Sequence, residues 1–172
     1  MTETLALTEL AERAIKEARR QGLRLVTAES CTAGALSTLL ADIPGAGDTL
    51  EGGFVSYAKS FKSTILGISP EILTRDTAVS ERVAVGMARG ALIRCPTASV
   101  AIAVTGVCGP KPDDDGNAVG LAYVAVADQQ GNAAGVRLEL EKDSSGRLRG
   151  QMISAALGVL VEFLSKSSNR IA

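Results

Sequence analysis

Ser30 is the residue of this sequence best placed for covalent chemistry. It follows an apolar segment, residues 23–28, and precedes residues 33–43, whose spacing predicts a helix. A serine hydroxyl at such a junction can bind an anion or attack a carbonyl carbon, because the first N–H groups of the following helix are unpaired. The N–H groups of Cys31, Thr32 and Ala33 are candidates for holding an oxyanion. The simpler alternative is that Ser30 only caps the helix.

The chain contains no histidine. Ser-His-Asp and Cys-His mechanisms and histidine-ligated zinc are therefore excluded. A lysine amine is the natural remaining base for a serine, provided that burial lowers its pKa from about 10.4 toward roughly 7–8. Cys31 is a second candidate nucleophile, with its acidity raised by the helix N-terminus, although a cysteine there can also be a small buried apolar residue.

Composition limits the kind of protein. The 172 residues are 46% hydrophobic and 3% aromatic with a net charge of -1, which predicts one globular domain over residues 1–172 with a core at about 8–164. The near-neutral charge gives no sign of nucleic-acid binding. The acidic start and the absence of an apolar run of about 20 residues indicate neither a signal peptide nor a membrane partner. We expect a cytoplasmic protein with a small-molecule substrate, and the sequence leaves open whether copies form a homo-oligomer.

Helical and strand patterns alternate early in the chain, and a strand pair comes late. This order predicts an α/β fold, a single three-layer α/β/α domain with a mixed sheet. Strands are expected at residues 23–28, 50–57, 98–104, 119–127 and 136–141. Helices are expected at residues 8–20, 33–43, 59–66, 80–94 and 148–164, with a further helix start at residues 69–71. Residues 105–117 are predicted to be a loop, Gly131-Asn132 a turn, and the tail from Ser165 frayed.

Several motifs together resemble the CinA C-terminal domain family, which includes stand-alone nicotinamide-nucleotide amidohydrolases. They are TAESCTAG (27–34), GGFVSYAKSFK (52–62), LGIS (66–69), AVSERVAVGMARGAL (78–92), AVTGVCGP (103–110) and VGLAYVAVA (119–127). The resemblance implies an α/β/α fold and hydrolysis of nicotinamide mononucleotide to nicotinate mononucleotide and ammonia, in pyridine nucleotide recycling. It also implies neither metal nor cofactor. Long members of the family carry an additional N-terminal domain, and we expect this chain to be without it.

The same resemblance implies roles for individual residues. Ser30 matches the nucleophilic serine, and Tyr57 and Lys62 match a tyrosine and a lysine of the family. We interpret Lys62 as the base and Tyr57 as the group that orients it or relays its proton, with Lys59 as a competing lysine. The implied substrate-binding residues are Cys31, Thr32, Thr105, Gly106, Gly109 and Arg149, with Pro110 in the same loop.

The sequence departs from the family pattern in two places. Asn117 and Ala118 replace the Lys-Pro that usually ends the glycine-rich loop. Three aspartates precede them at 113–115, and we expect these aspartates to lie in a solvated loop rather than to bind a cation. In KDSSGRLRGQ (142–151), a serine replaces the arginine of a Gly-Asp-Arg motif. Arg149 matches the later arginine of the family. Arg147 is a candidate to replace the missing arginine of the Gly-Asp-Arg motif, if the alignment to the family is shifted in register. Two alternatives therefore stay open: a nucleotide-binding module of the same fold without turnover, and a competence- or damage-associated partner protein.

Overall fold

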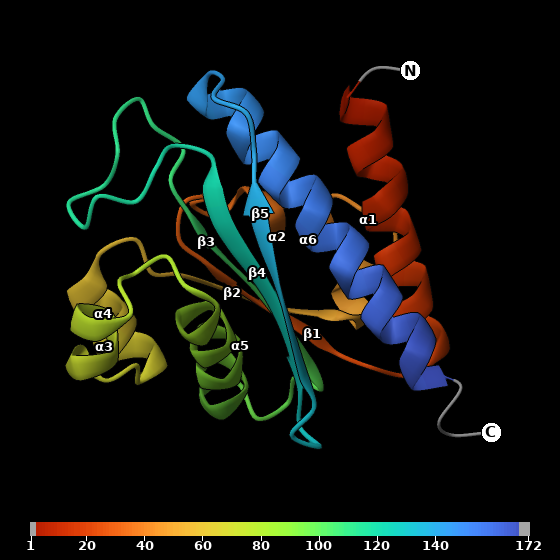
Figure 1. The fold of residues 1–172 in the computed structure, drawn as a ribbon. Coiled ribbons are helices and arrows are strands. Elements are labelled where there is room, and N and C mark those ends of the chain that lie inside the picture. The colour runs from red at the N-terminus through yellow and green to blue at the C-terminus, as the bar shows by residue number, and fades with distance from the viewer. Residues whose placement is uncertain (1–2, 169–172) are drawn as a thin grey trace.

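The computed structural model describes residues 3–168 and places them in one open, five-stranded sheet with helices on both faces (Figure 1). The strands are β1 (Leu25–Glu29), β2 (Leu50–Val55), β3 (Val100–Gly106), β4 (Leu121–Asp128) and β5 (Ala133–Glu139). The helices are α1 (Glu3–Arg20), α2 (Ala35–Ala41), α3 (Lys59–Leu66), α4 (Pro70–Arg75), α5 (Glu81–Arg94) and α6 (Ser145–Ser168), with a short 3-10 turn at Ala46–Asp48.

The sheet is mixed, as predicted. Its strand order is β2-β1-β3-β4-β5, with β1 parallel to both β2 and β3, and with β4 and β5 antiparallel to their neighbours. The chain therefore forms β2 on one side of β1 and later returns to form β3 on the other side of β1. Ligands of open α/β sheets collect at such a switch point, outside the carboxyl ends of the strands.

Alternating side chains of the central strands bury two separate cores. Val100, Ile102 and Val104 of β3 face α1, α2 and α6, whereas Ala101 and Ala103 face α5. The small alanines let α5 approach the sheet closely, and the branched residues fill the space beneath the long α1–α6 pair, whose two helices lie side by side in Figure 1. The result is the three-layer α/β/α arrangement that the sequence predicted.

Most predicted elements are present, with shifted ends. Helix α2 begins at Ala35 rather than at residue 33, because Ala33 and Gly34 adopt positive φ angles of 51° and 94° and so interrupt the helical path. Helix α6 runs through Ser168, so the prediction of a frayed tail from Ser165 is wrong for residues 165–168, and its remainder lies outside the described residues. Strand β3 extends to Gly106, so the loop starts later than predicted.

Helix α6 is the one helix in residues 3–168 that is long and apolar enough, by length and composition alone, to cross a membrane. Its apolar side lies in the core, where Leu148, Met152, Leu157 and Leu160 are fully buried against the sheet and α1. This is how the core helix of a soluble-type α/β domain packs.

Candidate active site

Three strand ends bring the candidate residues together. Ser30 directly follows β1, Ser56 and Tyr57 follow β2, and Cys108 comes two residues after β3. Because these three strands are parallel neighbours, their carboxyl ends meet at one edge of the sheet. Helix α3 starts three residues after Ser56 and carries Lys62 back over this edge.

The structure brings Lys62 and Ser30 into direct contact. The Nζ of Lys62 lies 2.7 Å from the Oγ of Ser30, 2.5 Å from the carbonyl oxygen of Ser56 and 3.3 Å from that of Tyr57. Both carbonyl groups are acceptors only, so they engage two N–H bonds of the amine. In neutral Lys62 the remaining position, directed at Ser30, holds the lone pair.

Lys62 is fully buried, and no carboxylate is paired with it among residues 3–168. Burial lowers its pKa from 10.5 to about 8, although the nearby thiol of Cys31 opposes the shift. Desolvation disfavours the ammonium form, and two carbonyl dipoles replace only part of the lost hydration. At neutral pH a useful fraction of Lys62 is therefore an uncharged amine.

Ser30 does not cap helix α2, so the capping alternative is wrong. The residue at the N-cap position is Gly34, and the groups at this helix start donate to the buried carboxylate of Glu29 instead. Glu29 accepts from the N–H groups of Gly34, Leu36 and Ser37 at 2.9, 3.1 and 2.8 Å, and from the hydroxyls of Ser37 and Thr27.

Glu29 is a positioning residue that the sequence analysis missed. Its place at the end of an otherwise apolar strand was the available signal, since a carboxylate fully buried there must find several donors. By holding the first turn of α2, Glu29 fixes the segment that carries Ser30 and frees the Ser30 hydroxyl for Lys62.

The candidate oxyanion donors differ in availability. The N–H of Ala33 donates to the carbonyl oxygen of Ser30 at 3.1 Å, which removes it from the predicted set. Within residues 3–168 the N–H groups of Cys31 and Thr32 have no acceptor. These two groups can therefore hold a developing oxyanion beside Ser30.

Tyr57 lies at the cleft without touching the lysine through its phenol. Its side chain is 72% exposed, and its hydroxyl makes no hydrogen bond within the described part of the chain. The carbonyl oxygen of Tyr57, rather than its side chain, accepts from Lys62. Lys59, the competing lysine, forms an ion pair with Asp115 at 2.5 Å, so its amine is engaged away from Ser30.

A cleft of about 640 Å³ opens above Ser30 and Lys62. This volume lies in the range of small-molecule sites. The predicted residues Cys31, Tyr57, Thr105, Gly106, Gly109 and Arg149 all line it. The hydroxyl of Thr105 is buried and donates to the carbonyl oxygen of Ala78 at 2.8 Å, which leaves it able only to accept from a ligand.

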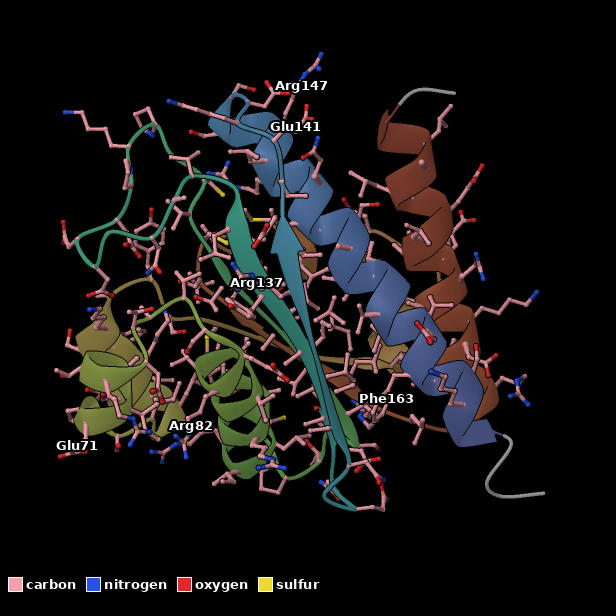
Figure 2. The ribbon with its side chains drawn as sticks, viewed as in Figure 1. Glu71, Arg82, Arg137, Glu141, Arg147 and Phe163 are labelled. Atoms are coloured by element: carbon pink, nitrogen blue, oxygen red, sulfur yellow. The ribbon has the colours of Figure 1, made fainter. Side chains whose placement is uncertain are left out.

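Thr32 and Arg149 lie at the clefts, whereas Arg147 does not. Thr32 lines a neighbouring cleft of about 600 Å³ that Arg149 also borders, and its buried hydroxyl has no partner within residues 3–168. The Nε of Arg149 donates to the carbonyl oxygen of Cys31 at 3.2 Å. Arg147 points away from the molecule at the start of α6 and pairs with Asp143, so it does not substitute for an arginine in the cleft (Figure 2).

Cys31 is a poor candidate for the attacking group. The residue is 4% exposed, and its thiol is directed toward the Sδ of Met152, 3.5 Å away. A hydrogen bond with Cys108 and burial raise the pKa of Cys31 well above its ordinary value. A thiol held protonated in this way is a weak nucleophile.

The three aspartates lie in a loop at the surface, as predicted, and hydrogen bonds order this loop. Asp113 accepts from the N–H groups of Asp115 and Asn117 at 3.1 and 2.8 Å, and Asp115 pairs with Lys59. Within the described residues no group of three or more His, Cys, Asp or Glu side chains is placed to hold a metal ion. The loop thus forms a fixed wall of the cleft.

The family follows from comparison with known proteins. Residues 7–164 match the family model described as the CinA C-terminal domain. This chain belongs to the CinA family. A CinA-like protein from Synechocystis is 40% identical over 129 residues, covering 75% of this chain and 30% of the relative. A putative competence-damage inducible protein from Desulforamulus reducens is 44% identical over 110 residues, covering 64% of this chain and 26% of the relative.

Solved CinA structures share the whole fold. A competence/damage inducible protein from Agrobacterium tumefaciens has a TM-score of 0.87 at 35% identity, covering 93% of this chain and 96% of that one. A CinA superfamily protein from Escherichia coli has a TM-score of 0.88 at 31% identity, covering 95% and 93%. The chain thus spans about a quarter to a third of the curated relatives described above, but nearly all of these solved chains.

Proposed function

We propose that this CinA domain is a serine–lysine amidohydrolase that converts nicotinamide mononucleotide to nicotinate mononucleotide and ammonia. The observation that carries the proposal is the 2.7 Å contact between the Nζ of Lys62 and the Oγ of Ser30, with the amine fully buried. A hydroxyl is a poor nucleophile without a base, and in a chain without histidine this amine is the group within reach.

In the first half of the reaction, neutral Lys62 takes the proton of Ser30 as the hydroxyl oxygen attacks the carboxamide carbon. The carbonyl oxygens of Ser56 and Tyr57 hold the amine in line during this transfer. The N–H groups of Cys31 and Thr32 then stabilise the oxyanion of the tetrahedral intermediate.

In the second half, the ammonium of Lys62 returns its proton to the departing nitrogen, and ammonia leaves. The product on the protein is an ester of Ser30. Water, with Lys62 again as the base, attacks this ester and releases the carboxylate of nicotinate mononucleotide. Each proton that Lys62 takes is given back, so no cofactor is needed.

The phosphate of the substrate is the part that selects a mononucleotide. Arg149 borders both clefts, and its terminal guanidinium nitrogens make no hydrogen bond or ion pair within residues 3–168. A guanidinium can bind a phosphate in a bidentate manner, and the unpartnered hydroxyl of Thr32 can add a further hydrogen bond. We infer that the nicotinamide ring of the substrate lies over Ser30 and that its phosphate lies by Arg149. We also infer that the enzyme recycles pyridine nucleotides in the cytoplasm.

Ammonia release from nicotinamide mononucleotide tests the reaction. Ser30→Ala and Lys62→Met should each lower the rate by at least a thousandfold, whereas Lys59→Met and Cys31→Ala should retain activity within about tenfold of wild type. Lys59→Met is a matched control, because it removes a lysine from the same helix and the same cleft. An inactive Cys31→Ala with an active Ser30→Ala would overturn the assignment of the nucleophile.

The same assay separates this function from the alternatives. Thermal stabilisation by the nucleotide without ammonia release would indicate a binding module. The absence of both responses would indicate a partner protein.

Comparing nicotinamide mononucleotide with its riboside tests the phosphate site. Arg149→Met should reduce the preference for the phosphorylated substrate at least tenfold, and Arg147→Met should leave it unchanged.

A further inference from the structure

Three sulfur atoms from distant parts of the chain meet at the wall of the cleft. Cys31 follows β1, Cys108 follows β3, and Met152 lies in α6. The Sδ of Met152 is 3.5 Å from the Sγ of Cys31 and 3.7 Å from that of Cys108. The thiol of Cys108 also lies 3.9 Å from the carbonyl oxygen of Cys31, so the two cysteines and Met152 form one cluster.

This spacing matches the coordination shell of a single ion. Metal–thiolate bonds are roughly 2.3 Å long, and three sulfurs around one ion in a plane are then roughly 4 Å apart. The two sulfur–sulfur distances fall a few tenths of an ångström short of that value. A small outward movement of the side chains therefore admits an ion at the centre of the three atoms.

The type of ligand selects the type of ion. Thiolate and thioether sulfurs are soft donors that favour Cu(I), whereas structural zinc takes four ligands from Cys, His and carboxylate groups. Met152 offers a thioether and is fully buried, so the set has three soft donors. A monovalent soft ion fits it better than zinc.

Charge and access also fit an ion at this place. Two thiolates around one monovalent cation carry a net negative charge, and the guanidinium of Arg149, which donates to the carbonyl oxygen of Cys31, can offset it. Cys108 is half-buried and lines the cleft, so an ion can reach the cluster from solvent through Cys108.

We propose that Cys31, Cys108 and Met152 form a binding site for one soft monovalent metal ion of the Cu(I) type. The ion displaces the protons of the Cys31 and Cys108 thiols, which pass to solvent, and the Met152 thioether completes the shell. No oxidation or reduction takes place. An ion held here is bound to Cys31, the residue that follows Ser30.

Silver(I), a redox-inactive ion of the same class, is the probe. The parent protein should carry Cys95→Ala, which removes the one cysteine outside the cluster and leaves the cleft intact. With methionine methyl groups labelled by ¹³C, NMR should show the Met152 resonance, identified by its absence in Met152→Leu, shifting at one equivalent of Ag(I). In competition titrations, Cys108→Ala should weaken Ag(I) binding at least a hundredfold and Met152→Leu at least tenfold.

An Ag(I) affinity unchanged in Cys108→Ala would overturn the proposal, and so would a Met152 methyl resonance that stays in place while Ag(I) binds. The resonance is followed in the parent protein, so the test holds even if Cys108→Ala fails to fold. Since neither measurement needs turnover, the result is independent of whether the protein hydrolyses an amide.

Discussion

Replacing Lys62 by methionine should abolish catalysis and remove a pH-dependent cost to the stability of the fold. The fold holds Lys62 in a place where its charge is disfavoured, with a pKa of about 8 against 10.5 in its ordinary state. That difference corresponds to about 3 kcal/mol of unfolding free energy, at 1.36 kcal/mol per pKa unit. The wild-type protein bears this cost at every pH below about 8 and is relieved of it as the pH rises toward 10.5.

The pH dependence separates this effect from the loss of contacts. Methionine leaves the carbonyl oxygens of Ser56 and Tyr57 without their donor, but that cost is the same at every pH. Between pH 7 and pH 10 the wild-type protein should gain about 2.5 kcal/mol relative to Lys62→Met, because the unfolded chain binds the additional proton in this window.

Urea unfolding followed by circular dichroism at pH 7, 8, 9 and 10, under reducing conditions, measures both free energies. Lys59→Met serves as the control, because it removes a partly exposed lysine from the same helix. If the stability difference between wild type and Lys62→Met does not change from pH 7 to pH 10, then Lys62 has an ordinary pKa and the reasoning is wrong.

Three further predictions concern catalysis and the turn at Ser30. The value of kcat/KM for ammonia release should rise about tenfold from pH 7 to pH 9, as the neutral fraction of Lys62 grows from about a tenth to about nine tenths; a flat profile would contradict this. Glu29→Gln should lower the unfolding free energy by about 2–3 kcal/mol, because the –NH₂ group of the glutamine would face N–H donors at the start of α2. An unchanged unfolding free energy in urea titrations would show that the carboxylate is dispensable. Ala33→Gly should raise the unfolding free energy by about 0.5–1 kcal/mol and the melting temperature with it, since the φ of 51° strains an alanine. A lower melting temperature would refute that strain.

The sequence predicted the fold well because its signals are local. Apolar segments marked the strands, Gly67 ended α3 where expected, and Ser69 and Ser80 cap α4 and α5 with their side chains. The ends of α2 could not be predicted in the same way. Its start depends on the positive φ angles of Ala33 and Gly34, which only the packing of the turn determines.

The site was predictable in its residue types but not in its geometry. The absence of histidine, with the family motifs, directed attention to Ser30 and Lys62, and the structure brings their side chains into contact. The role of Glu29 depends on donors from residues up to eight positions later, which no local pattern reveals. The cluster of Cys31, Cys108 and Met152 joins segments up to 121 residues apart, so only the fold makes it visible.

The activation of Ser30 by neutral Lys62 is tested most directly by covalent labelling with a sulfonyl fluoride, which requires no knowledge of the natural substrate. Peptide mass spectrometry locates the adduct, and the labelling rate is measured from pH 6 to pH 10. The account predicts an adduct on Ser30, a rate that rises with an apparent pKa of about 8, and no labelling in Lys62→Met. An adduct on Cys31, or an equal rate in Lys62→Met, would contradict it.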